Sequence, residues 1–161
     1  MYSDNLKIDE INSEDIEQVV ELQKICYREN FWEDKKVFEI LLSVYPKGAI
    51  KALYQEQLSG YIFFHPYIYN KIKPLNYTLE LKGNENCMHL HDLCIHPSYR
   101  GLGLSKLFLD SFDSETKLMG FKYQTLVAVQ GSEKMWSKYG FQVSKVINYG
   151  SESAYYMTRI F

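Results

Sequence analysis

Hydrophobic and polar positions recur along the chain with spacings that predict strands at both ends and helices between them. Residues 6–11 alternate apolar and polar side chains, which indicates a short strand. Asn12 followed by Asp15 predicts a helix start, and apolar positions then recur at helical spacing as far as Cys26. The remaining expected elements are a helix over 33–43, strands at 49–55, 58–66 and 88–96, a helix over 105–119, a strand at 123–129, a helix over 132–139, and strands at 141–148 and 153–161.

The long third helix has an apolar stripe that predicts which side faces the core. We expect its inner positions to follow the i, i+3, i+4 rhythm, and Gly120 to end it. These positions are Leu104, Leu107, Phe108, Ser111, Phe112, Glu115 and Leu118. In the second helix, the same reasoning places Val37, Ile40 and Leu41 on the inner side.

The segment between 70 and 87 shows little regular pattern beyond an extended piece at 76–81. Long irregular segments in compact domains are usually functional or disordered. A mobile surface hairpin and a loop that covers substrate both fit this sequence.

The order of the expected elements indicates the fold class. A hairpin half is followed by a strand-helix-strand unit, which predicts an α+β or mixed α/β fold with a partly parallel sheet. A length of 161 residues predicts a single domain over residues 1–161. A chain of this size can bury a sizeable core without disulfides or a structural metal.

Composition and charge narrow the function classes. The net charge of -2 argues against bulk attraction to nucleic acid or to an anionic membrane. The N-terminal residues show no signal-peptide pattern, and no apolar run is long enough to span a bilayer. Three cysteines, Cys26, Cys87 and Cys94, cannot all pair, so we expect a reducing compartment, no disulfide framework and a cytoplasmic location.

A glycine-rich turn between a strand and a long helix carries the clearest chemical signal. It reads Arg100-Gly101-Leu102-Gly103-Leu104-Ser105. Glycines let backbone N–H groups turn toward an anion, the helix dipole adds favourable potential, and Arg100 adds a charged donor. The turn is therefore interpreted as a cradle for a phosphate or pyrophosphate.

Two common phosphate-binding classes do not fit this turn. The pattern Gly-x4-Gly-Lys-Ser/Thr of nucleotide triphosphatases is absent. A dinucleotide fingerprint lacks its third glycine, because the turn continues into Lys106, and the strand at 123–129 offers no carboxylate for a ribose. An NAD-linked enzyme is thus disfavoured.

The same turn resembles the Arg/Gln-x-x-Gly-x-Gly/Ala signature of the GNAT superfamily of acyl-CoA N-acyltransferases, with Ser105 at the last small position. Residues 90–100 look like the fourth strand and turn of that family, and 135–141 look like its late Gly-Phe corner. Three landmarks stand in the family's order. The resemblance implies a mixed, partly parallel, twisted sheet of six to seven strands flanked by about four helices.

The resemblance also implies where acetyl-CoA binds. A bulge at Leu93 would splay the strand, and a backbone N–H near Leu93 would polarise the thioester carbonyl. Backbone amides from Arg100 to Ser105 would hold the pyrophosphate. The implied cofactor-binding residues are Leu93, Cys94, Ile95, Arg100, Gly101, Leu102, Gly103, Leu104, Ser105, Ser132 and Trp136.

The acid and base are less directly indicated. Many family members place a tyrosine four residues before the Gly-Phe corner, where this chain has Trp136. The departing thiolate would then be protonated by Tyr139, by Ser132 or by water. His91 and Asp92 are the candidate bases, with the unperturbed pKa of histidine near 6.5. Strand alternation predicts His91 on one face, and Asp92 and Cys94 on the other.

The hypothesis is acetyl transfer from acetyl-CoA to a primary amine by direct attack in a ternary complex, with no metal. The acceptor stays open among a small amine or amino acid, a protein amine and an aminoglycoside, and monomer and homodimer are both open. The alternative is a non-catalytic module that senses acyl-CoA on the same fold.

Overall fold

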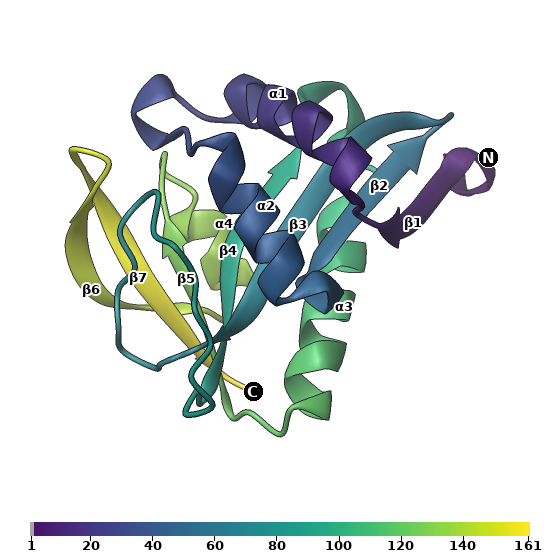
Figure 1. Ribbon diagram of the computed structural model, residues 1–161. Coiled ribbons are helices and arrows are strands. Elements are labelled where there is room, and N and C mark those ends of the chain that lie inside the picture. The colour runs from purple at the N-terminus through teal and green to yellow at the C-terminus, as the bar shows by residue number, and fades with distance from the viewer. Residues whose placement is uncertain (1) are drawn as a thin grey trace.

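The computed structural model describes residues 2–161, with side chains from residue 4 onward. Within these residues the chain forms four α-helices and one seven-stranded sheet of order β1-β2-β3-β4-β5-β7-β6 (Figure 1). The strands are β1 Leu6–Glu10, β2 Ala49–Tyr54, β3 Gln57–Tyr67, β4 Cys87–Ile95, β5 Tyr123–Ala128, β6 Gln142–Tyr149 and β7 Glu152–Ile160. The helices are α1 Ile16–Cys26, α2 Lys35–Val44, α3 Leu104–Leu118 and α4 Glu133–Lys138. The mixed α/β class is confirmed, and most elements lie within two residues of their expected bounds.

One pair of strands gives the sheet its mixed character. Among the described residues, β4 and β5 are the parallel neighbours, and the other neighbouring strands are antiparallel. Helix α3 makes the crossover between β4 and β5, as a parallel connection requires. The unit β4-α3-β5 therefore forms the centre of the domain.

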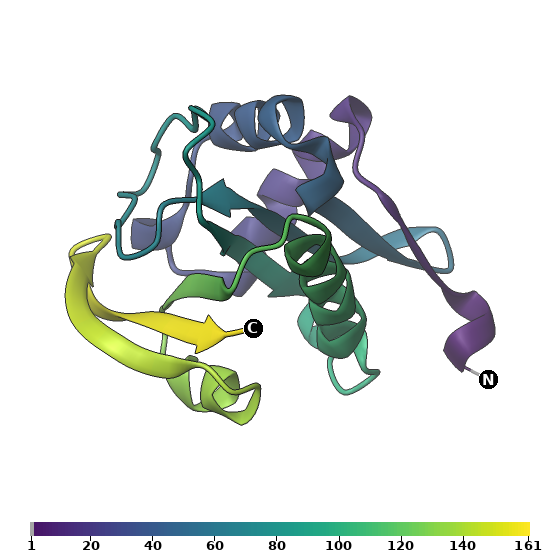
Figure 2. The ribbon, with the colours of Figure 1, turned by 90° about the horizontal axis from the view of Figure 1, so that it is seen from below.

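Two helical layers cover the sheet, α1 and α2 on one face and α3 and α4 on the other (Figure 2). Phe38 of α2 is fully buried against Tyr61 and Phe63 of β3. On the opposite face, Phe112 of α3 packs edge-on against Phe64. Successive residues of β3 thus supply the two cores, as strand alternation requires.

The predicted start of the first helix is confirmed in detail. The side chain of Asn12 accepts a hydrogen bond from the amide of Glu14, and Asp15 accepts one from the amide of Asn12 at 2.8 Å. This reciprocal capping satisfies amides that have no partner inside a helix. A short 3-10 turn over Ser13–Asp15 precedes α1.

The inner face of α3 differs from the predicted stripe. Leu107 is 38% exposed and Leu118 is 78% exposed. Leu104, Phe108 and Phe112 of the predicted stripe are buried, and Leu109 and Thr116 are buried in addition. The sheet contacts the side of the helix that carries both phenylalanines, and this side leaves out the two predicted leucines. On α2, the predicted inner positions Val37 and Leu41 are buried and Ile40 packs against the same core, and Phe38 is buried in addition.

The segment 68–86 between β3 and β4 contains no helix or strand among its described residues, so the extended piece expected at 76–81 is not a strand. This segment nevertheless packs against the rest of the domain. Lys73 and Leu79 are buried, and the amide of Asn76 donates to a Glu33 carboxylate oxygen at 3.0 Å. The amide of Asp34 in turn donates to the side chain of Asn76 at 2.9 Å. This loop therefore forms a wall beside α2.

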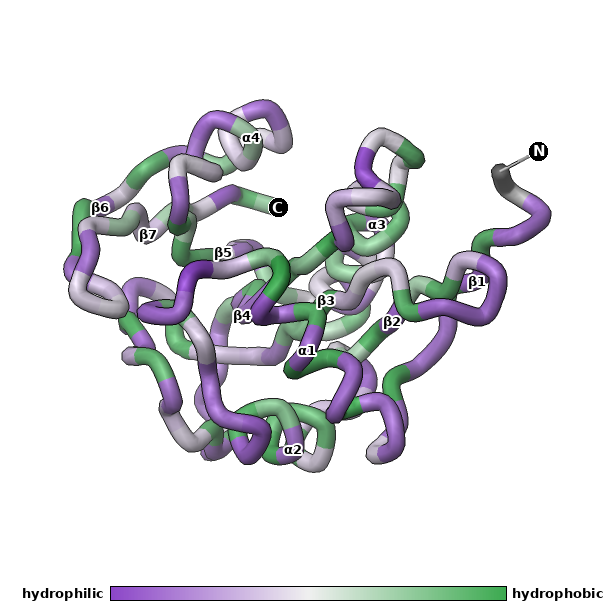
Figure 3. Tube along the Cα trace, turned by 90° about the horizontal axis from the view of Figure 1, so that it is seen from above, coloured by the Kyte–Doolittle hydropathy of each residue, from purple (hydrophilic) through white to green (hydrophobic). Residues whose placement is uncertain are grey.

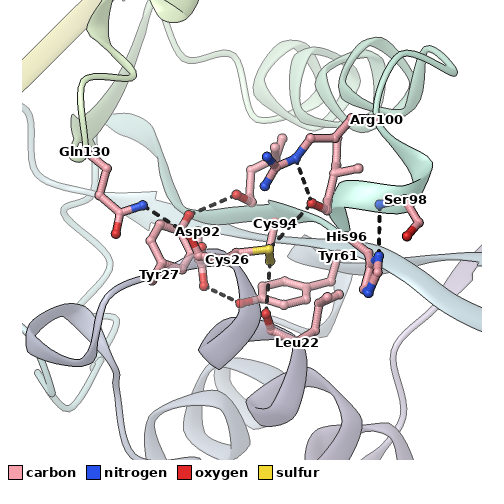
Figure 4. Close-up of a disulfide and its surroundings, with 12 residues drawn as sticks. Leu22, Cys26, Tyr27, Tyr61, Asp92, Cys94, His96, Ser98, Arg100 and Gln130 are labelled. Carbon is pink, nitrogen blue, oxygen red and sulfur yellow. Dashed lines mark hydrogen bonds between the residues drawn. A yellow bond between two sulfur atoms is a disulfide. The ribbon is translucent and has the colours of Figure 1, made fainter.

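The structure joins Cys26 and Cys94 in a disulfide, although the sequence argued for a reducing compartment and against a disulfide framework (Figure 4). Their Cα atoms are 6.3 Å apart although 68 residues separate them in sequence. The pair forms where the end of α1 meets β4, a proximity that sequence spacing does not reveal. Cys87 is a free, buried thiol, and burial raises its pKa to about 11.

In the described part of the chain, no helix is both long and apolar enough to cross a membrane.

Reducing the Cys26–Cys94 disulfide should lower the stability of the fold. Opening a loop of 68 residues removes about 4 kcal/mol in the chain-entropy view. At roughly 2–4 °C per kcal/mol, the melting temperature should fall by about 8–16 °C in reductant. Thermal unfolding followed by circular dichroism measures this. The Cys26→Ser variant should melt at the same temperature with and without reductant, and an unchanged wild-type melting temperature would contradict the assignment.

Candidate active site

A cleft of about 590 Å³ opens where β4 separates from β5. The two strands pair over Met88–Leu90 and Gln124–Leu126 and no further. The splay was expected, but it begins at Leu90 and not at Leu93. Beyond it, Leu93 and Ile95 of β4 and Val127 and Val129 on the other side line the cleft.

The glycine-rich turn closes one end of this cleft. A 3-10 turn over Pro97–Tyr99 leads to Gly101 and Gly103, whose φ angles of 81° and 84° are favourable only for glycine. Gly103 is the N-cap residue of α3 and supplies no side-chain cap. The first amides of this 15-residue helix are thus placed to meet an anion in the cleft.

Arg100 lies at the mouth of the turn and is exposed. Its Nε donates to the carbonyl of Ile95 at 3.2 Å, which ties the side chain back to the end of β4 (Figure 4). This bond holds the guanidinium beside the turn, where its other N–H groups can reach a phosphate oxygen.

The structure brings together nearly all residues that the sequence assigned to the cofactor. Leu102 is the exception, since it does not line the cleft among the described residues. Those that line it are Leu93, Cys94, Ile95, Arg100, Gly101, Gly103, Leu104, Ser105, Ser132 and Trp136.

Residues of α4 line the cleft on the side away from the turn. Helix α4 lies apart from α3 on the same side of the sheet (Figure 3). Trp136 is 6% exposed and packs edge-on against Phe141. Ser132 donates its hydroxyl to the Val129 carbonyl at 2.7 Å. Tyr139 also lines the cleft, with its ring 6.2 Å from that of Trp136.

A bulge in β4 changes which side chains share a face. Phe63 of β3 pairs with Asp92 and Phe64 pairs with Leu90, so His91 is the extra residue. The expectation that Asp92 lies opposite His91 is therefore wrong. Both side chains point toward the α1–α2 side, because the bulge interrupts the strict alternation. Cys94 lies on that face too, so its predicted separation from His91 was also wrong.

His91 is held between two charged side chains that the sequence reading missed. Its Nε2 lies 2.6 Å from a Glu33 carboxylate oxygen, and its Nδ1 lies 2.5 Å from Lys73 Nζ. Glu33 comes from the connection between α1 and α2, and Lys73 comes from the loop 68–86. We define Glu33, His91 and Lys73 as the buried triad.

Asp92 binds neutral partners instead. The hydroxyl of Tyr61 donates to its carboxylate at 2.6 Å, and Tyr27 also contacts it (Figure 4). Tyr27 donates its hydroxyl to the Leu93 carbonyl at 2.9 Å. Burial, followed by the charge of Asp92, raises the pKa of both tyrosines, so they remain neutral donors.

A small cavity of about 40 Å³ adjoins the cleft. His91, Asp92 and Tyr27 line both the cleft and the small cavity. Glu33 and Tyr149 line the small cavity but not the cleft. No motif marks Glu33, Lys73, Tyr61 or Tyr149, because segments far apart in sequence supply them. The sequence around Lys73 has no regular hydrophobic spacing, so it did not indicate that this lysine is buried.

Burial and local charge change the proton affinities in this region. Burial raises the pKa of Asp92, and the contacts with His91 and the two tyrosines only partly oppose it. Burial also acts to raise the pKa of Glu33, but His91, Lys73 and the Asn76 amide outweigh it, so that pKa is lowered. Burial lowers the pKa of Lys73 to about 8, against the opposing pull of Glu33 and Asp92.

A family model, the acetyltransferase (GNAT) domain, matches residues 44–151, which include β4, the glycine-rich turn, α3 and α4. The chain belongs to this family. No curated protein matched the GNAT chain in a separate sequence comparison.

Solved structures share the GNAT fold over nearly their whole length. Ard1 from Thermoplasma volcanium has a TM-score of 0.79 at 18% identity, with 97% of each chain covered. Arabidopsis thaliana Naa50, in complex with the bisubstrate analogue CoA-Ac-MVNAL, has a TM-score of 0.77 at 15% identity, covering 98% of this chain and 99% of that one. PaiA N-acetyltransferase from Thermoplasma acidophilum, in complex with coenzyme A, has a TM-score of 0.72 at 18% identity, covering 97% and 99%. At these identities the likeness establishes the fold.

The Arg100→Ala variant of this GNAT domain should bind coenzyme A about tenfold more weakly, because a charged hydrogen bond is worth roughly 1.5–3 kcal/mol. Isothermal titration calorimetry measures the affinity. Lys122→Ala, which removes an exposed positive charge just before β5, serves as the control. Equal affinity in the wild type and in Arg100→Ala would remove Arg100 from the anion site.

Proposed function

We propose that this protein transfers an acetyl group from acetyl-CoA to a primary amine by direct attack in a ternary complex. One observation carries the proposal: the cleft is lined by the glycine-rich turn and adjoins a small cavity with a group of buried ionisable side chains. The family membership and the coenzyme A complexes of similar structures support it.

The unpaired edge of β4 suits the extended arm of acetyl-CoA. Beyond Leu90, β4 has no ladder partner in β5. The Leu93 and Ile95 carbonyls already accept from Tyr27 and Arg100. Backbone amides on an edge without a neighbouring strand favour an extended ligand that can accept their hydrogen bonds. In the proposal, Leu93, Cys94 and Ile95 bind the pantetheine arm, the Leu93 N–H polarises the thioester carbonyl, and Arg100 with the turn amides holds the pyrophosphate.

Asp92 is the better candidate for the base. Both ring nitrogens of His91 already face Glu33 and Lys73, so neither is free to take a proton from substrate. The Asp92 carboxylate lines the cleft and the small cavity, and burial raises its pKa, which strengthens it as a proton acceptor. Glu33, also on the cavity wall, is held by His91 and by the Asn76 amide.

The proposed reaction balances without a covalent enzyme intermediate. Asp92 accepts a proton from the acceptor ammonium, and the freed amine lone pair attacks the thioester carbonyl carbon. The carbon–sulfur bond then breaks, the departing thiolate takes a proton from an acid on the protein, and the second proton that the nitrogen must lose to become an amide restores that acid. Tyr139 is the candidate donor to the thiolate, because it lines the cleft and carries a phenol O–H, whereas Trp136 offers only an indole N–H.

Acetyl transfer is tested by following thiol release from acetyl-CoA with a panel of small amines, amino acids, peptides and aminoglycosides. We expect release that depends on the amine. Binding without turnover across the panel would instead favour the acyl-CoA sensor. Saturating acetyl-CoA at one hundred times its dissociation constant should stabilise the fold by about 2.7 kcal/mol, or about 5–10 °C. Stabilisation by NAD and not by coenzyme A would contradict the proposal.

The pH dependence tests the role of Asp92. Because burial raises its pKa, activity should increase as the pH rises through that raised value and should be lost as the pH falls below it. Asp92→Asn should lower kcat by about 10²-fold or more, the usual contribution of a general base, and should remove this acidic limb. Retention of the limb in Asp92→Asn would assign the base elsewhere. Glu14→Gln, at an exposed residue before α1, serves as the control.

A further inference from the structure

With Lys73 as the ammonium and Glu33 ionised, the buried triad has one consistent arrangement of protons. A lysine ammonium can only donate hydrogen bonds, and an ionised carboxylate can only accept them. His91 therefore accepts from Lys73 at Nδ1 and donates from Nε2 to Glu33, at distances of 2.5 and 2.6 Å. This makes the imidazole neutral, with its hydrogen on Nε2.

The triad is well protected from water. The side chains of His91 and Glu33 are 3% and 6% exposed, and Lys73 is 4% exposed. Glu33 is held further by its backbone, since its amide donates to the Gln23 side chain and its carbonyl accepts from it. A buried charge without a partner is costly, so the negative charge of Glu33 requires one compensating positive charge nearby.

The other groups near His91 do not provide that charge. The ring of His65 lies 6.2 Å from that of His91, and the ring of His89 lies 5.5 Å from that of His65. Burial disfavours the charged forms of both His65 and His89 and holds their pKa values far below the ordinary histidine value. Asp92 is an acid. The remaining titratable groups that line the adjoining cavity are the phenols of Tyr27 and Tyr149, whose pKa values are raised. Either Lys73 or His91 must therefore carry the positive charge.

The position of that charge matters for the proposed acceptor site. Glu33, His91 and Asp92 line the small cavity, whereas Lys73 is not part of its described lining. A charge on Lys73 lies behind the imidazole ring. A charge on His91 would lie on the cavity wall next to Asp92, where it would repel an acceptor ammonium.

We infer that Lys73 is a positioning residue, which keeps the compensating charge of the triad behind His91 and so keeps the cavity wall neutral at that ring for a cationic acceptor amine. This inference rests on the proposed function. The neutral state of His91, on which the inference depends, can be measured without any enzymatic activity. The loop 68–86 thus contributes to the site through a buried cation.

The test compares the wild type with Lys73→Met, which keeps the length of the side chain and removes its charge. Glu33 then lacks its counter-charge, so His91 should protonate more readily. We expect the pH midpoint of the His91 ring signals, followed by ¹⁵N NMR, to rise by about one unit or more. The KM for the acceptor should rise about tenfold at pH 7 and recover at higher pH, and the KM for acetyl-CoA should not change. Loss of His91 signals in His91→Asn assigns the resonances.

Lys82→Met is the matched control, because Lys82 is an exposed lysine of the same loop. It should leave the ring signals and both KM values as in the wild type. An unchanged His91 midpoint in Lys73→Met, or an equal rise in both KM values at every pH, would overturn the inference.

A second measurement covers the case in which Lys73→Met does not fold. In the wild type at pH 7, the ¹⁵N shifts should show an unprotonated Nδ1 and a protonated Nε2. An imidazolium signal there would overturn the inference. If no amine is acetylated but the ring signals behave as expected, the proposed function fails while the charge arrangement stands.

Discussion

The separation of β4 from β5 after three paired residues is the constraint on which the rest of the site depends. Parallel strands in the middle of a sheet normally satisfy each other's backbone groups over their whole length. Here the ladder ends at Leu90 and Leu126, and the strands diverge into a cleft. Backbone groups beyond the ladder need other partners, and the carbonyls of Leu93 and Ile95 accept from Tyr27 and Arg100 instead. The same divergence brings the glycine-rich turn and α4 to opposite sides of one space.

The bulge at His91 decides the chemistry inside that space. An unbroken strand would place His91 and Asp92 on opposite faces, and only one of them could face the α1–α2 side. With His91 as the extra residue, both line the cleft and the small cavity. They then have different environments. His91 is fixed by two charged partners, whereas Asp92 receives hydrogen bonds from neutral phenols and keeps a raised pKa.

The loop 68–86 shows how a segment without regular structure can be part of a rigid site. Asn76 ties it to Glu33 and to the amide of Asp34. Lys73 reaches from it into the protein and contacts His91. Such buried polar contacts stabilise a fold only when every member has a partner, and the triad meets this condition through Glu33 and His91. The loop, the connection between α1 and α2, and β4 are thereby coupled through three side chains.

The sequence by itself determined the elements, their order and the turn at Arg100 to Ser105, because capping, hydrophobic spacing and glycine conformations are local properties. The fold class followed from that order. Only the tertiary structure decided which face His91 and Asp92 share, since a bulge depends on pairing with a neighbouring strand. The Cys26–Cys94 disulfide and the burial of Lys73 were likewise beyond the sequence, because each depends on residues that lie far apart along the chain and meet only when it folds.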